Sequence, residues 1–290
     1  MAKNALIFGI NGQDGYYLRW LLEAKGITVS GVGRQQNNDS GILNLQWITD
    51  LLADHKPDYI FHFAANSSTR HEVWMENHQT ISTGTFNILE AVKTVSPLSK
   101  VFISGSGLQF KNSEKPILET DPFEARDAYS VSRIQSVYAA RYYRSLGIKT
   151  YIGYFFNHES PRRTEKHISK MIAEAVKKIN AGEDRIIEIG DPAVVKEWTY
   201  APDIVEAVWT LIQQDEVFEA VIGSGKGYSI QQYIEYCFAF INRDWKKYVK
   251  IKDGFKAEYR TLVSDPSTIT GLGWKPKTDI RELVKIMLAE

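Results

Sequence analysis

Three glycines near the N-terminus are spaced so that they could bind a dinucleotide. They lie between a short apolar run and a stretch of helical periodicity. Glycines at such a turn let the chain bend sharply and let a pyrophosphate approach bare backbone, while the helix N-terminus supplies N–H groups. Ordinary tight turns also carry glycines, but the strand, turn and helix context favours a dinucleotide site. The residues that we expect to contact this cofactor are Gly9, Asn11, Gly12, Gln13, Asp14 and Gly15.

The end of the second apolar run distinguishes NADP from NAD. A carboxylate there would bond the ribose hydroxyls of NAD, whereas a cation would pair with the 2′-phosphate of NADP. The sequence reads Gly31-Val32-Gly33-Arg34-Gln35-Gln36, with an arginine and no acid. We therefore predict that the cofactor is NADP(H) and that Arg34 contacts it. The alternative is that Arg34 is only a solvated loop cation.

A charged segment from Asn157 to Arg163 follows a later apolar run and could bind phosphate. It offers an amide, an imidazole, a carboxylate and two guanidiniums in a loop stiffened by Pro161. Arginine presents a fork of donors that matches phosphate oxygens, and ligands collect at the carboxyl ends of strands in α/β sheets. This favours a diphosphate-binding rim over a charged surface loop with local Glu–Arg pairing.

The elements that would position these residues alternate regularly in the first half of the chain. Short apolar runs and longer helical stretches form the pattern of βαβ units around a parallel sheet buried on both faces. The runs predict strands at 5–8, 28–32, 59–63, 101–104 and 150–155. One helical face carries Phe86, Leu89 and Val92, and Gly26 ends the first helix.

The second half has shorter elements and no clear linker. We predict helices at 167–181 and 203–212, a strand at 186–189, and a capping box of Ser229 and Gln232 that starts another helix. The fold class is therefore α/β, with a Rossmann-like doubly wound parallel sheet and a smaller C-terminal α/β substrate-binding domain.

Composition excludes several classes of protein. The 35 basic and 35 acidic side chains give a formal net charge of zero, which disfavours nucleic-acid and membrane-surface partners. The single cysteine, Cys237, cannot form an intrachain disulfide, and the six histidines show no metal-ligand spacing. We find no signal peptide and no membrane-spanning run, so we expect a cytoplasmic protein without a metal site.

Taken together, the motifs resemble the extended short-chain dehydrogenase/reductases that modify nucleotide sugars, and within them the GDP-mannose 4,6-dehydratase group. The segment most similar to that group's signature is Phe156-Asn157-His158-Glu159-Ser160-Pro161-Arg162-Arg163. The supporting matches are Gly12-Gln13-Asp14-Gly15, Phe63-Ala64-Ala65-Asn66-Ser67, Glu197-Trp198 and Leu272-Gly273-Trp274-Lys275-Pro276.

The resemblance implies a GDP-hexose or related sugar nucleotide as the substrate. It implies an NADP-binding domain at 1–156, which also takes elements near 186–212, and a mainly sugar-nucleotide-binding domain at 157–290. The further cofactor contacts that it implies are Phe63, Ala64, Ala65, His158 and Arg163. The implied substrate contacts are Asn66, Asn157, Lys196, Trp198 and Arg260.

The superfamily's catalytic machinery is a Tyr-x-x-x-Lys pair on a helix, with a Ser or Thr from the end of the preceding strand. The residues at the matching positions are Tyr129, Arg133 and Ser106. Arg133 keeps the positive charge, but a guanidinium does not lose a proton and so cannot relay one. Tyr129 and Arg133 would also contact the cofactor; the alternative is an ordinary exposed helical pair. We expect a homodimer formed through this helix.

Leu108 stands where the dehydratases carry a glutamate, two residues after the catalytic hydroxyl. In those enzymes the glutamate removes the C5 proton after C4 has been oxidised to a ketone, and leucine cannot act as a base. We therefore predict NADP-dependent hydride transfer at C4, by a 4-keto reductase or a dehydrogenase. The alternatives are a dehydratase that uses another base, and a catalytically silent subunit that binds cofactor or sugar nucleotide.

Overall fold

The computed structural model describes residues 3–34 and 41–289, and its centre is a six-stranded sheet. The strand order is β10-β5-β4-β3-β1-β2, and each pairing is parallel. The strands are β1 (Asn4–Phe8), β2 (Thr28–Val32), β3 (Tyr59–His62), β4 (Lys100–Ser106), β5 (Thr150–Phe155) and β10 (Glu219–Ile222). The chain moves from β1 to β2 on one side and through β3, β4 and β5 on the other. This is the predicted doubly wound arrangement.

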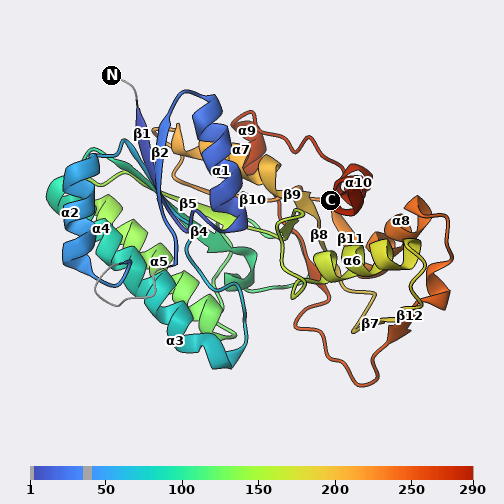
Figure 1. Ribbon diagram of the computed structural model, residues 1–290. Coiled ribbons are helices and arrows are strands. Elements are labelled where there is room, and N and C mark those ends of the chain that lie inside the picture. Colours follow the sequence, from blue (N-terminus) through green and yellow to red (C-terminus); the bar gives the residue numbers. More distant parts are fainter. Residues whose placement is uncertain (1–2, 35–40, 290) are drawn as a thin grey trace.

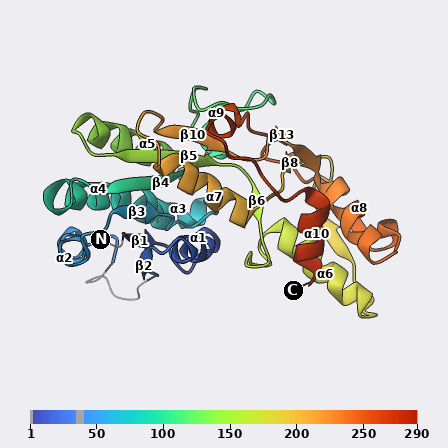
Figure 2. The same cartoon turned by 90° about the horizontal axis from the view of Figure 1, so that it is seen from above.

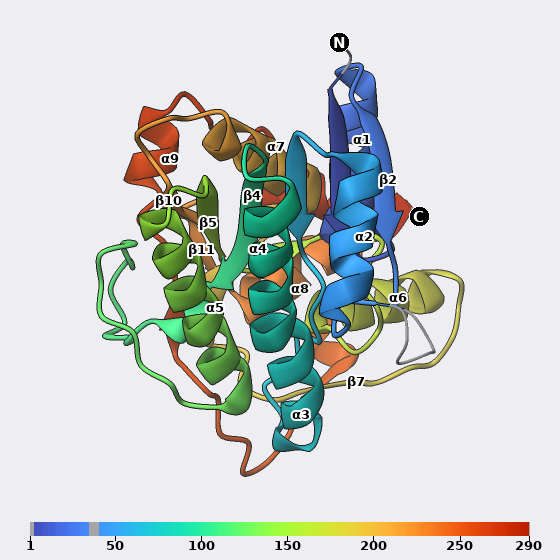
Figure 3. The ribbon, with the colours of Figure 1, turned by 90° about the vertical axis from the view of Figure 1, so that its left-hand side faces the viewer.

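Helices cover both faces of this sheet (Figures 1 and 2). The helices on one face are α2 (Leu45–His55), α4 (Gly84–Val95) and α5 (Ala128–Ser145), which lie side by side in Figure 3. The helices on the other face are α1 (Gln13–Ala24) and α7 (Ala201–Ile212). Because both faces are covered, nearly all residues of the central strands β1, β3, β4 and β5 are buried, whereas the edge strand β2 is partly exposed.

A second group of elements packs around its own apolar core beside the sheet (Figure 1). Its helices are α6 (Ile168–Asn180), α8 (Ile230–Phe240) and α10 (Ile280–Ala289). Its larger sheet contains β11 (Gly227–Ser229), β8 (Val195–Glu197) and β13 (Thr261–Leu262). The short strand pairs are β12 (Val249–Ile251) with β7 (Ile187–Ile189), and β6 (His158–Glu159) with β9 (Thr199–Tyr200). Two short helices, α3 (Trp74–Asn77) and α9 (Ser267–Gly271), complete the architecture.

Most predicted elements are present, and the differences have local causes. The capping box of Ser229 and Gln232 starts α8 as predicted. Of the elements at 186–212, only α7 joins the large sheet, because β7 and β8 pair within the second group. Phe86 was expected to be buried with Leu89 and Val92, but 44% of it is exposed. Within the described residues, none of the helices combines the length and apolar character needed to cross a bilayer.

Candidate functional site

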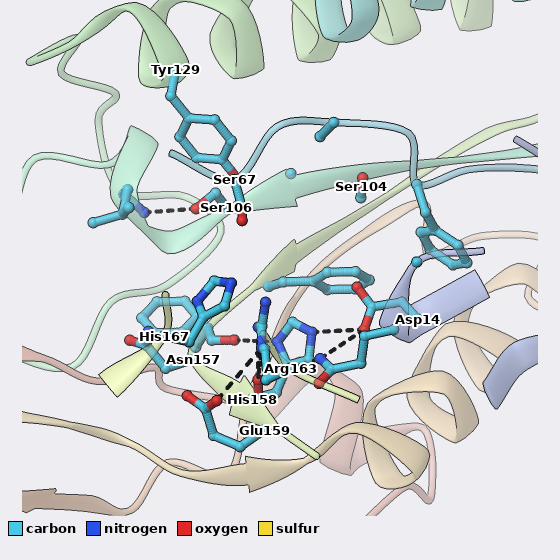
Figure 4. Close-up of a pocket in the computed structure, with 18 of the residues that line it drawn as sticks. Asp14, Ser67, Ser104, Ser106, Tyr129, Asn157, His158, Glu159, Arg163 and His167 are labelled. Carbon is cyan, nitrogen blue, oxygen red and sulfur yellow. Dashed lines mark hydrogen bonds and ion pairs between the residues drawn. The ribbon is translucent and has the colours of Figure 1, made fainter. Parts of the chain in front are cut away.

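A cavity of about 310 Å³ opens at the carboxyl ends of β1, β3, β4 and β5, where the sheet meets the second group of elements. Figure 4 shows the side chains that line it. The predicted site residues among them are Gly9, Gly12, Gln13, Asp14, Gly15, Phe63, Ala65, Ser106, Tyr129, Arg133, Asn157, His158, Arg163 and Lys196. The parallel topology explains this gathering, because loops that follow neighbouring parallel strands meet at one edge.

The glycine turn between β1 and α1 forms a cradle that side chains would fill. A Cβ on Gly15 would lie 2.4 Å from the Gly9 carbonyl oxygen, and a Cβ on Gly9 would lie 2.7 Å from the Ala64 nitrogen. Gly9 also has a φ of 90°, which favours glycine. No side chain caps α1 at Gly12, so the N–H groups of its first turn remain available. This cradle fits a dinucleotide pyrophosphate.

An ion pair joins the cradle to the segment after β5. The His158 Nε2 atom lies 2.9 Å from Asp14 Oδ1, and its Nδ1 atom lies 2.7 Å from the Phe156 carbonyl oxygen. Burial alone would raise the pKa of Asp14, but His158 and then Arg163 outweigh it and lower the pKa to about 2. Asp14 is therefore held as a carboxylate.

Two further contacts fasten the same segment to α1. The Ser160 hydroxyl donates to Gln13 Oε1 at 2.6 Å. The Arg162 guanidinium carbon lies 3.7 Å from the centre of the Tyr16 ring, within the range of a cation–π contact. With the Asp14–His158 pair, these contacts lay residues 158–162 across the first turns of α1. We refer to the three contacts together as the α1 clamp.

Tyr129 and Arg133 are buried on the cavity side of α5, with 7% and 5% of each residue exposed, so the alternative of an exposed helical pair is wrong. The Arg133 guanidinium carbon lies 5.1 Å from the centre of the Tyr129 ring. Arg133 Nη1 donates to the Ser104 carbonyl oxygen and, at 2.9 Å, to Ser104 Oγ. Its buried Nε has no hydrogen-bond partner among the described residues.

Ser106 is placed to donate a hydrogen bond into the cavity. Its Oγ accepts a hydrogen bond from the Leu108 N–H at 3.2 Å, and its own N–H donates to Gln109 Oε1 at 2.8 Å. These contacts form a capping box that fixes the turn after β4. Because the Ser106 oxygen acts as an acceptor within the turn, its hydroxyl proton remains free for a ligand.

Leu108 forms part of an apolar wall of the cavity. It and Leu262 also line a second cavity of about 260 Å³, on the other side of this wall. Two carboxylates lie in that second cavity. Asp127 accepts a hydrogen bond from the Ser130 N–H at 2.8 Å, and Glu258 accepts one from Thr69 Oγ1 at 2.7 Å.

The part of the cavity that Lys196 and Arg163 line carries two cations around one buried carboxylate. Glu159, 3% exposed, has Oε1 3.8 Å from Lys196 Nζ and Oε2 3.5 Å from Arg163 Nε. Burial acts to raise the pKa of Glu159. Lys196 and Arg163 have the opposite effect and together outweigh burial, so the pKa of Glu159 is lowered. For Lys196, burial lowers the pKa and outweighs Glu159, which acts to raise it. The buried Oδ1 of Asn157 has no partner among the described residues.

Several predicted contact residues lie outside this cavity. Trp198, which we expect near the sugar-nucleotide pocket, is buried and stacks on Tyr233 with ring centres 4.2 Å apart. It contacts the cavity residue Lys196, whose Nζ lies 4.4 Å from the centre of the Trp198 ring. Arg34 is exposed and pairs with Glu76. The predicted residues that do not line the cavity are Asn11, Arg34, Ala64, Asn66, Trp198 and Arg260.

Three cavity residues were missed by the sequence analysis as site residues. Ser104 anchors Arg133, Glu159 organises the two cations, and His167 extends into the cavity from the start of α6. Glu159 lies inside the signature segment, which could have indicated it. Ser104 and His167 carry no signal beyond their positions next to a strand end and a helix start.

Comparisons with known proteins agree with this geometry. A family model described as GDP-mannose 4,6 dehydratase matches residues 39–287. GDP-mannose 4,6 dehydratase 2 of Arabidopsis thaliana is 30% identical over 322 residues, covering 99% of this chain and 86% of that protein. GDP-mannose 4,6-dehydratase of Vibrio cholerae is 30% identical over 349 residues, covering 100% of this chain and 94% of that protein.

Solved structures establish the fold. RMD from Pseudomonas aeruginosa, solved with NADPH, superposes with a TM-score of 0.85 at 20% identity, covering 100% of this chain and 97% of that one. UDP-glucose 4-epimerase from Thermotoga maritima, solved with UDP-glucose, superposes with a TM-score of 0.86 at 21% identity, covering 99% and 97%.

Proposed function

Because this chain belongs to the GDP-mannose 4,6 dehydratase family of short-chain dehydrogenase/reductases, we propose that it transfers hydride at C4 of a sugar nucleotide. In this proposal the enzyme is an NADP-dependent 4-keto reductase or dehydrogenase that acts on a GDP-hexose or a related sugar nucleotide. Residues 1–156, with α7 and β10, would bind the cofactor, and most of 157–290 would bind the sugar nucleotide.

The observation that carries the proposal is the state of the carboxylates in the cavity. In the part of the chain that the structure describes, two carboxylates line it, Asp14 and Glu159, and cations hold both. Each has a lowered pKa, so each is a weak base. In this proposal Leu108 stands at the position where the family resemblance expects the dehydratase glutamate. Elimination of water across C5 and C6 therefore lacks a free carboxylate to act as the base, whereas reduction of a C4 ketone does not need one.

The chain's own groups suit that reduction. A nicotinamide cofactor bound here would supply the hydride for C4, and the Tyr129 hydroxyl would donate its proton to the C4 oxygen, so that the ketone becomes an alcohol. The free Ser106 hydroxyl donates a hydrogen bond to the same oxygen as negative charge develops there. Arg133 stacks on Tyr129 and has an unpartnered Nε available for the nicotinamide ribose.

The positive charge of Arg34 favours NADP over NAD, although Glu76 already forms an ion pair with Arg34. Glu76 pairs with Arg34 and also accepts a hydrogen bond from Asn66 at 2.9 Å. A 2′-phosphate on the adenosine ribose could take the place of this carboxylate as the partner of Arg34.

The function is tested by incubating the purified protein with GDP-mannose or its 4-keto-6-deoxy derivative, each with NADP⁺ or NADPH. We expect NADPH absorbance to fall only with the keto sugar, and the product mass to rise by two hydrogen masses. Loss of water from GDP-mannose would instead establish a dehydratase despite Leu108. Tight NADPH binding without either reaction would establish the silent subunit. NADH in place of NADPH is expected to react more slowly.

We also propose that the protein is a homodimer formed through α4 and α5. Apolar side chains project from these two helices around a groove of about 580 Å³, and Tyr138 and Tyr142 are each 58% exposed. A second copy would bury these rings in a helical interface. Replacing both tyrosines by aspartate is expected to halve the mass measured by light scattering. Phe240→Asp, on the 53% exposed ring of α8, is the matched control and should leave the mass unchanged.

A further inference from the structure

His167 is a cavity residue without a defined partner. It immediately precedes α6, and its imidazole lies between Ser106 and Asn157 in Figure 4. Neither of its ring nitrogens has a hydrogen-bond partner among the residues that the structure describes, although its backbone N–H donates to the Thr164 carbonyl oxygen. A half-buried imidazole that faces a cavity without a protein partner is available to a ligand.

The charges around His167 keep it neutral when no ligand is bound. Burial is the largest of the effects that lower the pKa of His167, and Arg163, Lys196 and His158 lower it further. Glu159 opposes them, and the resulting pKa is about 4. The imidazole therefore adds no charge of its own to the two cations beside it near neutral pH.

A diphosphate would reverse this electrostatic balance. Arg163 and Lys196 line the cavity beside His167, and both lie within 4 Å of the Glu159 carboxylate. A ligand with two negative charges would be attracted to the surplus of N–H donors in this cluster. Once it is bound, its negative charge would favour the protonated imidazole.

We propose that His167 binds the diphosphate of the sugar nucleotide and takes up a proton as it does so. The inference rests on the proposed function, since it assumes a sugar-nucleotide ligand. It deepens that function by identifying a residue that couples substrate affinity to pH.

Other titratable or charged groups face the same cavity and are alternative acceptors of the proton. Those on neighbouring elements are Asp14 on α1, Tyr129 and Arg133 on α5, His158 and Glu159 on β6, Arg163 after β6 and Lys196 on β8. Asp14 and Glu159 have pKa values that are already lowered, and a nearby diphosphate would have to raise these pKa values to near neutral pH before either group took up the proton. His158 is already bonded to Asp14. His167 is the remaining imidazole in the cavity.

The proposed proton uptake makes the affinity for a diphosphate depend on pH. The free protein has a lower pKa for His167 than the complex, so the complex binds more protons between these two values. Affinity for a diphosphate therefore increases as pH falls through the pKa of the complex, by up to about tenfold per pH unit, until the free pKa is reached.

GDP carries the diphosphate without the reacting sugar, and GDP-mannose, whose diphosphate does not ionise near neutral pH, is titrated in parallel because the terminal phosphate of GDP itself gains a proton near about pH 6. The full-length protein is first saturated with NADP⁺ so that GDP cannot enter the cofactor site. Calorimetric titrations at about pH 6, 7 and 8, in buffers with different heats of ionisation, give the affinity and the number of protons taken up. We expect close to one proton near neutral pH, and an affinity that increases toward pH 6.

Two variants separate this role from a structural one. His167→Gln is expected to abolish proton uptake and to weaken GDP binding about tenfold near pH 6, with a smaller effect near pH 8. In turnover with the keto sugar, it should raise KM much more than it lowers kcat. His55→Gln, at the exposed end of α2, is the matched control and should behave as wild type.

Three results would overturn the inference: failure of GDP to bind, binding without proton uptake, or proton uptake that persists in His167→Gln. The proposed function fails separately, when NADPH is not oxidised by the keto sugar. A protein that takes up a proton with GDP but transfers no hydride would uphold the role of His167 and refute the reductase.

Discussion

Tyr129→Phe is expected to lower the rate of hydride transfer by about a thousandfold, because the substitution removes only the proton donor for the C4 oxygen. The aromatic ring, which Arg133 stacks against, is retained. Affinity for NADPH should therefore change little. Single-turnover oxidation of NADPH by the 4-keto sugar measures the rate, and quenching of protein fluorescence measures the affinity.

The matched control for this experiment is Tyr143→Phe. Tyr143 lies on the same helix and is buried to a similar degree, but its hydroxyl donates to Glu90 at 2.7 Å, away from the cavity. This variant should keep its turnover and lose about 1 kcal/mol of unfolding free energy with the hydrogen bond. Unchanged turnover in Tyr129→Phe would refute the assignment of Tyr129 as the proton donor.

Gly15→Ala is expected to weaken NADPH binding at least tenfold and to lower the free energy of unfolding by about 1–3 kcal/mol. The new Cβ would meet backbone on two sides, at 2.4 Å from the Gly9 oxygen and 2.7 Å from Ile10 Cα. Neither atom belongs to a flexible side chain, so either α1 or the turn after β1 must move. That movement would spoil the cradle for the pyrophosphate.

Gly271→Ala is the control for this effect, because Gly271 also lies in a helix and a Cβ there would meet no atom within 4 Å. Alanine favours the helix over glycine, so this variant should be as stable as wild type or up to about 1 kcal/mol more stable. Urea unfolding gives both stabilities, and NADPH titration gives the affinities. Normal cofactor binding by Gly15→Ala would contradict the role of the cradle.

The sheet could be predicted from the sequence where the pattern was strong. The five strands β1 to β5 are apolar runs separated by helical stretches, and Gly26, with a φ of 75°, follows α1 as predicted. The sixth strand, β10, was missed because four residues in a region of irregular spacing give no period to detect. Phe86 was misplaced because steps of three residues drift around a helix, and its ring turns away from the core that buries Leu89 and Val92.

The site was predictable where a motif carried it. The glycine turn, the Asn157–Arg163 segment and the Tyr129 helix converge on one cavity, as their positions after neighbouring parallel strands suggest. Contacts between residues distant in sequence were not predictable. Glu76 pairs with Arg34 from 42 residues further along the chain, and Tyr233 stacks on Trp198 and keeps it in the core. His167 belongs to no motif, and only the folded chain places it beside Arg163 and Lys196.

The position of β10 has a consequence for how the chain folds during synthesis. This strand pairs with β5 along Ile152 to Phe155, yet it is made after α6 and the strands β6 to β9 of the second group. Until Ile222 has left the ribosome, β5 has an unpaired edge, and until Ile212 has left it, the sheet also lacks the cover of α7. Nascent chains at this stage expose apolar surface and an open strand, which are the features that chaperones bind and that promote aggregation. The six-stranded sheet is therefore completed late, and premature termination between residues 156 and 219 would yield an aggregation-prone fragment.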